Sequence, residues 1–119
     1  MASIQNEYSL LCRLYDTDMN EMSHYENIPL LAYSPLAGGL LTGKYLNENM
    51  PKDSRMALFK GWERHLNPLA MNAYEEYHKL AKEYNMTMAQ LAQAFVNSRP
   101  FATSNIIGAT TMEQLKENI

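Results

Sequence analysis

A run of six apolar residues at positions 28–33 constrains the fold more than any other feature of this chain. Glu26 and Asn27 precede the run, and Ser34 and Pro35 follow it, so turn-forming residues bound it on both sides. A run of this length suits a β-strand buried on both faces better than a helix, which is usually longer. Strands of this kind are typical of parallel sheets covered by helices, so the run predicts an α/β fold.

Strand-like and helix-like segments alternate along the rest of the chain. The other strand candidates are the region at Ile4 and residues 103–107, and the helix candidates are residues 16–25, 68–84, 88–98 and a last helix from Thr110 or Thr111 onward. This alternation implies a parallel sheet with helices between its strands. Three strands leave two open sheet edges, so we expect the chain to be part of a larger fold.

Sequence signals mark where the two longer helices begin. Asn67 is placed as an N-cap before Pro68, and Thr87 and Gln90 form a capping box. Apolar residues recur at helical spacing behind each start, so both helices are expected to be amphipathic. The expected inward faces are Ala73, Tyr77, Leu80, Ala81 and Tyr84 in the first helix, and Met88, Leu91, Ala92 and Phe95 in the second.

Composition removes several classes of function. Ten basic residues against thirteen acidic ones give a net charge of −3, which argues against a domain held to nucleic acid by phosphate contacts. Cys12 is the single cysteine, and His24, His65 and His78 lack metal-ligand spacing, so no metal site is expected. The sequence has no apolar run long enough to span a membrane and no signal peptide, so we expect a cytoplasmic protein without a membrane partner.

The glycine-rich segment at residues 37–45 carries the sharpest local pattern. Gly38 to Lys44 match the G-x-x-x-x-G-K pattern of a P-loop directly after a predicted strand. Tyr45 follows, where a P-loop needs serine or threonine for magnesium, and the polar stretch at 46–67 begins as a poor helix. A true P-loop is therefore disfavoured, and a glycine-rich turn without a ligand remains an alternative. The stretch at 46–67 is long enough to be a functional loop.

A second segment suited to an anion lies at residues 108–111. Gly108 ends a predicted strand there, and Thr110 or Thr111 can cap the helix that follows. Free N–H groups at a helix start favour an anion. An ordinary strand-to-helix turn explains the same residues, so that alternative stays open.

Together, these segments resemble the C-terminal part of the aldo-keto reductases. The motifs that carry the resemblance are Gln5-Asn6-Glu7-Tyr8, residues 31–39 (LAYSPLAGG), residues 41–45 (LTGKY), and Gly108-Ala109-Thr110 followed by Gln114, Glu117 and Asn118. They occur in order over nearly the whole chain. The resemblance is greatest to the branch that includes bacterial oxidoreductases and the β subunits of voltage-gated potassium channels.

The resemblance implies an α/β fold that is the C-terminal part of a (β/α)8 TIM barrel, truncated at both ends. Residues 1–119 would then be a partial NADP-dependent oxidoreductase domain with strands six, seven and eight, the large loop after strand seven and the start of the last helix. The family reduces aldehydes and ketones with NADPH, so the expected cofactor is NADP(H), and the implied cofactor-binding residues come from three parts of this chain.

Each part has an implied role. Gln5 would bond the nicotinamide carboxamide, and Tyr33 would stack on the nicotinamide ring. Backbone N–H groups of residues 34–38 would wrap the pyrophosphate, with Lys44 adding positive charge and Arg55 directed toward the adenosine phosphate. The pyrophosphate residues are Ser34, Pro35, Leu36, Ala37 and Gly38, and the adenosine end would be held by Gly108, Thr110, Gln114, Glu117 and Asn118.

The family's catalytic tetrad of aspartate, tyrosine, lysine and histidine is not among the matched segments. No catalytic residue is therefore assigned, and Tyr33 matches the stacking position rather than the acid. The implied function is the cofactor-binding half of a reductase whose partner in the intact enzyme is a small carbonyl substrate, with the isolated chain inactive. The alternative is a non-catalytic half-barrel that associates with itself or another chain. Self-association of this chain is expected because of its open sheet edges.

Overall fold

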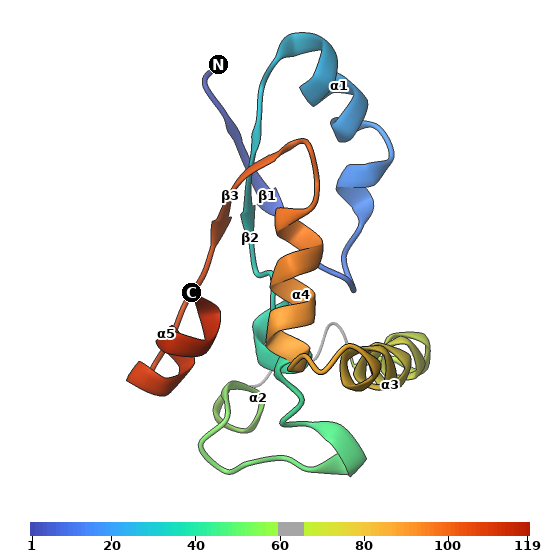
Figure 1. Cartoon of the computed structure of the whole chain (residues 1–119), viewed down its shortest axis with the longest axis vertical. Coiled ribbons are helices and arrows are strands. Elements are labelled where there is room, and N and C mark those ends of the chain that lie inside the picture. The colour runs from blue at the N-terminus through green and yellow to red at the C-terminus, as the bar shows by residue number, and fades with distance from the viewer. Residues whose placement is uncertain (60–65) are drawn as a thin grey trace.

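The computed structural model describes residues 1–59 and 66–119 and shows an α/β fold built on a three-stranded parallel sheet (Figure 1). The strands β1 (Ile4–Glu7), β2 (Leu30–Tyr33) and β3 (Ala102–Ile106) lie side by side in chain order. In their parallel register, Glu7 pairs with Tyr33, and Tyr33 pairs with Ile106. The carboxyl ends of all three strands therefore lie at the same end of the sheet. The predicted strand order and parallel pairing are confirmed.

Helices fill the connections, as the alternation predicts. They are α1 (Met19–Glu26), α2 (Arg55–Leu58), α3 (Pro68–Glu83), α4 (Met88–Asn97) and α5 (Met112–Asn118). Asn67 accepts a hydrogen bond from the Ala70 amide at 3.0 Å, and Thr87 and Gln90 exchange both bonds of the predicted capping box. Thr111, rather than Thr110, caps α5. Short 3₁₀ turns at Leu14–Asp16, Ala37–Thr42 and Leu46–Glu48 complete the path.

One face of the sheet is covered and the other is open. Leu30 and Ala32 of β2 are fully buried and pack in a cluster with Val96 of α4, whereas Leu31 and Tyr33 on the opposite face are only half-buried. The prediction that residues 28–33 are buried on both faces is therefore wrong, because helices cover a single face. Figure 1 shows α1 and α4 on the same side of the strands.

β3 is also more exposed than the sequence predicts. It spans Ala102–Ile106, close to the predicted 103–107, but it is an edge strand, and Thr103 and Ser104 are exposed. Ile106 is 40% exposed on the open face. This strand thus has polar residues at most of its exposed positions, and Ile106 is its one exposed large apolar residue.

A cluster of aromatic side chains joins β1 to α4. Tyr8 is fully buried, stacks on Phe95 with ring centroids 5.6 Å apart, and meets Phe101 edge-on. Its hydroxyl donates a 2.6 Å hydrogen bond to Asp16, which also accepts a bond from Arg13. Burial, followed by this bond and the Asp16 charge, raises the pKa of Tyr8 well above its ordinary value. Tyr8 is thus a neutral packing residue at physiological pH.

The inward face of α3 matches the prediction only in part: Ala81 is buried, and Ala73 and Tyr77 are half-buried. Tyr74 is also buried, whereas Leu80 and Tyr84 are exposed, Tyr84 to 69%. The apolar residues of α3 are spread over much of its surface. Their spacing in the sequence therefore did not select the face that packs against Tyr45 and the start of α4. In α4 the buried residues are Met88, Ala89, Ala92, Gln93 and Val96, and the predicted Leu91 and Phe95 are half-buried beside them.

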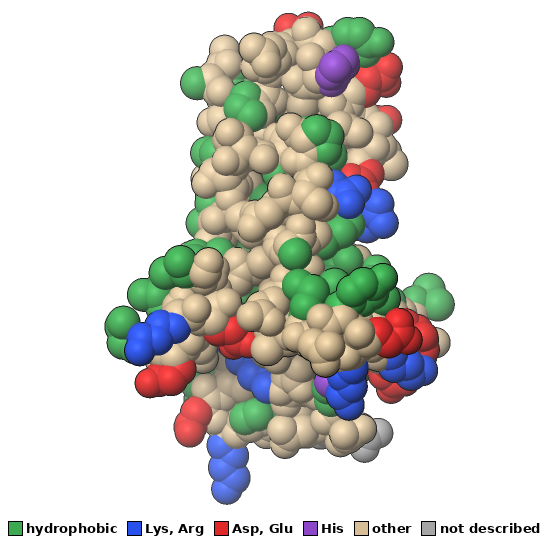
Figure 2. All heavy atoms as spheres, in the orientation of Figure 1, with side chains coloured by type: hydrophobic (Ala, Val, Ile, Leu, Met, Phe, Trp, Pro, Cys, Tyr) green, Lys and Arg blue, Asp and Glu red, His purple; other side chains and the backbone are tan. Residues whose placement is uncertain are grey.

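The molecule is elongated, with extents of 44 × 28 × 27 Å. Most charged side chains visible in Figure 2 lie on the wider half that carries α2, α3 and α5, and those of the narrower half lie along its top and one edge. Within residues 1–59 and 66–119, no helix is both long and apolar enough to cross a membrane.

Candidate functional site

A cavity of about 770 Å³ opens beyond the carboxyl ends of β2 and β3. This is the end of a parallel sheet where α/β proteins bind ligands. Its walls come from the segment after β2, from the α2 region, from Ala89 at the start of α4 and from the segment after β3. The predicted site residues that line it are Tyr33, Ser34, Pro35, Leu36, Gly38, Lys44, Arg55, Gly108, Thr110, Gln114, Glu117 and Asn118.

Two predicted residues do not line this cavity. Gln5 is exposed on β1 and pairs with Leu31, so it lies on the same open sheet face as Tyr33 but two residues nearer the amino ends. Ala37 is 1% exposed, with its methyl group in the core and its amide donating to the Ser34 carbonyl at 2.9 Å. The Ala37 N–H is thus bonded within the loop, so it is not one of the N–H groups of residues 34–38 that would be available to a phosphate.

The loop after β2 has an unusual backbone that the sequence does not reveal. Ser34 and Ala37 adopt left-handed conformations, with φ of 56° and 48°, although neither is glycine. Such conformations cost about 1–2 kcal/mol for residues with a Cβ. They are concentrated at ligand-binding and catalytic segments, where the surrounding structure holds them in place. Two such conformations within four residues indicate that the surrounding structure holds this loop in a defined conformation.

The structure also distinguishes between the two interpretations of the glycine-rich segment. In a P-loop, a helix begins at the lysine and presents its N-terminus to the phosphates. Here Lys44 is followed by the short 3₁₀ turn Leu46–Glu48, and Tyr45 is buried. A magnesium-dependent P-loop is therefore excluded, and the glycines serve a turn, with φ of 98° at Gly39 and 86° at Gly43.

Gly43 provides a direct test of this loop geometry. We expect Gly43→Ala to lower the free energy of unfolding by about 1–2 kcal/mol, because a Cβ strains a residue at positive φ. Gly108→Ala is the matched control, because Gly108 does not need positive φ and a Cβ there meets nothing within 4 Å. Urea denaturation of both variants measures the difference, and equal loss in the two would contradict the assigned backbone.

Both signs of charge line the cavity. The Lys44 ammonium lies 5.2 Å from the centroid of the Tyr45 ring, and a Cβ on Gly39 would come within 3.2 Å of it. The missing side chain at Gly39 thus leaves room for the lysine. Arg55 begins α2, and Asp53 and Glu117 contribute negative charge to the same walls. The cavity wall therefore carries two cations, Lys44 and Arg55, although the chain as a whole has a net negative charge.

The α5 side of the cavity is made of amide groups. Gln114 Oε1 accepts hydrogen bonds from the Thr110 amide at 2.9 Å and from its hydroxyl at 3.0 Å. Asn118 Nδ2 donates to the Gly108 carbonyl at 3.5 Å. Both side chains line the cavity, as their spacing of four residues on one helix predicts. These bonds tie the helix to the turn that follows β3.

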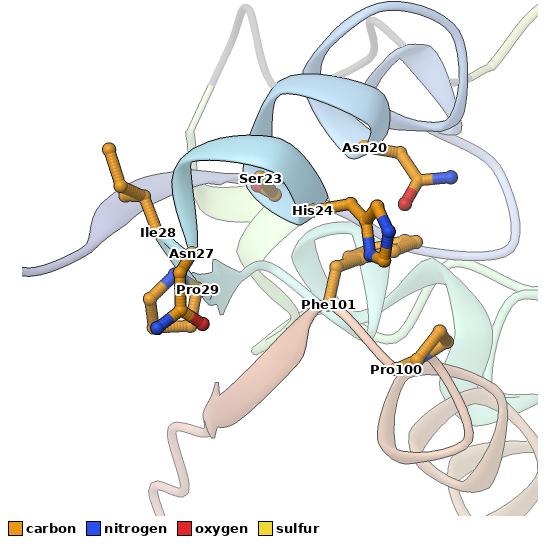
Figure 3. A pocket seen from close by; sticks show the side chains of 8 residues that line it. All are labelled: Asn20, Ser23, His24, Asn27, Ile28, Pro29, Pro100 and Phe101. Atoms are coloured by element: carbon orange, nitrogen blue, oxygen red, sulfur yellow. The ribbon is translucent and has the colours of Figure 1, made fainter.

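A second, smaller cavity of about 170 Å³ lies near the amino ends of β2 and β3. Figure 3 shows the side chains of Asn20 and His24 on one side of it, close to Phe101 and Pro100. Its lining holds no Lys, Arg, Asp or Glu, and it lies at the opposite end of the sheet from the larger cavity. His65 lies outside the described residues, and among the described ones no three His, Cys, Asp or Glu side chains group as metal ligands do.

Comparison with known proteins assigns the chain to a family. The model of the Aldo/keto reductase family matches residues 1–119, so this chain belongs to that family. It is 44% identical to Protein tas of Escherichia coli (strain K12), over the whole of this chain and 34% of that protein. It is 36% identical to the L-glyceraldehyde 3-phosphate reductase of the same organism, over 97% of this chain and 35% of that protein.

The family branch is also as predicted. The chain is 37% identical to a probable voltage-gated potassium channel subunit beta of Arabidopsis thaliana, over 97% of this chain and 36% of that protein. The chain thus spans about a third of the length of the curated relatives it matches. The resemblance to bacterial oxidoreductases and channel β subunits is confirmed.

Proposed function

We propose that this chain binds NADP(H) as the cofactor-binding part of an aldo-keto reductase, within one partial reductase domain at residues 1–119. On this proposal β1, β2 and β3 are strands six, seven and eight of a (β/α)8 barrel. The observation that carries the proposal is the large cavity at the carboxyl ends of the strands. Its lining includes all of the residues implied by the family resemblance except Gln5 and Ala37, and they come from the loop after β2, the α2 region and the α5 segment.

The lining of the cavity matches the parts of a dinucleotide. Tyr33 offers a flat ring for the nicotinamide, which supplies or accepts hydride when the cofactor is bound. The shaped loop at residues 34–38 and Lys44 suit the pyrophosphate. Glu117 and the side-chain amides of α5 can donate to or accept from an adenine base. Gln5 lies on the same sheet face as Tyr33, outside the cavity lining, and on this proposal it bonds the nicotinamide carboxamide.

The second phosphate of NADP(H) is the reason for preferring it to NAD(H). Arg55 supplies a guanidinium at the cavity wall, which suits bidentate recognition of a phosphate. One relative, 32% identical over 98% of this chain and 35% of its own length, is named an NADH-specific methylglyoxal reductase of Escherichia coli (strain K12). The two cofactors are therefore compared directly in the test below.

In the intact enzyme, the bound nicotinamide would supply hydride to an aldehyde or ketone, and the family's catalytic tetrad would supply the proton. The segments of this chain that resemble the family do not include the tetrad, so the chain's own residues bind and orient the cofactor. Relatives named for L-glyceraldehyde 3-phosphate and methylglyoxal support a small carbonyl substrate. We place the protein in the cytoplasm, where such substrates and NADPH are available.

A second candidate function is a non-catalytic association module. The observation that favours it is that, in the part of the chain that the structure describes, β1 and β3 are edge strands beside an open sheet face. A relative named as a channel subunit supports a role in assembly. This function can coexist with cofactor binding.

Fluorescence titration of the purified chain tests the proposed function. We expect NADPH to bind at least tenfold more tightly than ATP with magnesium, and more tightly than NADH. Magnesium-dependent binding of ATP that exceeds NADPH binding would contradict the proposal. Tighter binding of NADH would move the assignment to NAD(H).

A further inference from the structure

Gln93 of α4 is a buried polar residue beside the proposed cofactor cavity, 7% exposed, and it is not among the predicted site residues. Its Nε2 donates a 2.7 Å hydrogen bond to Oδ1 of Asn118, the last residue of α5. We infer that Gln93 is a positioning residue, which fixes the amide of Asn118 and thereby sets how the cavity recognises the adenosine end of the cofactor. The inference rests on the proposed function.

The two hydrogen bonds of the Asn118 side chain differ in length and therefore in strength. The bond from Gln93 is short at 2.7 Å, whereas the contact from Asn118 Nδ2 to the Gly108 carbonyl is long at 3.5 Å. Oδ1 is therefore held toward α4, and Nδ2 can exchange its weak contact for an acceptor in the cavity, such as a ring nitrogen. Asn118 lines the cavity and Gln93 does not, so Gln93 acts through Asn118.

The position of α5 adds to the importance of this bond. None of the seven residues of α5, all of them in the described part of the chain, is fully buried. Apolar packing therefore holds the helix only weakly. An asparagine amide can also turn over between two orientations of similar energy. A donor on the neighbouring helix selects one of them, and a buried donor without its acceptor is costly.

Gln93→Glu is the sharpest variant, because it keeps the size of the side chain and replaces the donor by an acceptor. The carboxylate repels Oδ1 and attracts Nδ2, so the amide of Asn118 turns over. We expect about tenfold weaker binding of 2′,5′-ADP and NADPH, and unchanged binding of nicotinamide mononucleotide, by isothermal titration calorimetry. Asn97→Ala, an exposed position on the same helix, is the control and should leave all three affinities unchanged.

A double-mutant cycle and a spectrum separate positioning from stability. In the otherwise unaltered chain, Gln93→Met should weaken binding of 2′,5′-ADP. In an Asn118→Ala background, the same substitution should weaken that binding by less than twofold. In ¹⁵N-resolved NMR spectra without ligand, the side-chain amide signals of Asn118 should move in Gln93→Glu and Gln93→Met and stay in Asn97→Ala. A static Asn118 signal, or equal weakening of nicotinamide mononucleotide, would overturn the inference.

The experiments distinguish failure of the proposed function from failure of the positioning role of Gln93. If the unaltered chain binds neither NADPH nor 2′,5′-ADP, the proposed function is wrong and this inference falls with it. If the unaltered chain binds both and Gln93→Glu binds them equally well, only the positioning role of Gln93 is wrong.

Discussion

The purified 119-residue chain should reduce 4-nitrobenzaldehyde with NADPH at least about 100-fold more slowly than a full-length relative under the same conditions. General acid catalysis contributes roughly 10² to 10⁴ in rate, and the acid of this family is not among the residues that the chain shares with it. The tyrosines with shifted pKa values point the same way. Burial raises the pKa of Tyr8 and of Tyr74, which makes each a poorer proton donor at neutral pH.

The assay follows NADPH oxidation by the loss of its absorbance. The chain is tested at several concentrations, and a reductase relative is the positive control. Tyr33→Phe is an informative second protein, since it keeps the ring and removes its hydroxyl. We expect it to match the unaltered chain. A rate within tenfold of the relative would contradict the proposal, and loss of that rate in Tyr33→Phe would identify Tyr33 as the acid.

Self-association is the second large effect we expect. Among residues 1–59 and 66–119, β1 and β3 each pair with one strand, so the sheet has two edges without a neighbouring strand, and its open face carries half-buried Leu31 and Tyr33 and the 40% exposed Ile106. Pairing of β3 in each copy with β1 of the other would close two sheets into a barrel-like assembly, with the open faces inside. The chain should therefore behave as a dimer or a larger assembly rather than as a monomer.

Size-exclusion chromatography with light scattering measures this state. We expect a mass of at least two chains, and a shift toward one chain in Ile106→Lys, which places a charge on the open face. Leu69→Lys is the matched control, because Leu69 is an exposed apolar residue of α3 outside the sheet. A sharp peak at the mass of one chain, with cooperative unfolding, would contradict the expectation.

Local sequence signals predicted the parts of the fold that depend on local chemistry. Asn67 and the Thr87–Gln90 pair mark helix starts because their side chains cap backbone N–H groups within three residues. The strand at Leu30–Tyr33 was recognisable from its length and its bounding turns. Most of the candidate site also followed from the sequence, because the family motifs fall where the strands end and the cavity opens.

The parts that depend on tertiary packing were not predictable in this way. Tyr74, rather than Tyr84, packs inward because the neighbouring cluster decides which side of α3 is covered. Burial alternates along β2 because helices cover a single face of the sheet. No local sequence pattern shows how many faces are covered. Gln93 was missed because it bonds to a residue 25 positions away. The left-handed backbone of Ser34 was not predicted, because that conformation is usually indicated by a glycine and the residue here is serine.

The central claim is that the cavity beyond β2 and β3 binds NADP(H), and NADPH fluorescence titration of matched variants tests it most directly. Tyr33→Ala and Arg55→Ala remove the proposed ring platform and the proposed phosphate partner. Tyr84→Ala and Lys79→Ala remove an exposed tyrosine and an exposed cation of the α3 region, neither of which lines the cavity. We expect the first pair to weaken NADPH binding by about 5- to 150-fold each and the second pair to leave it unchanged. Equal affinity in all five proteins would contradict the assignment of this cavity.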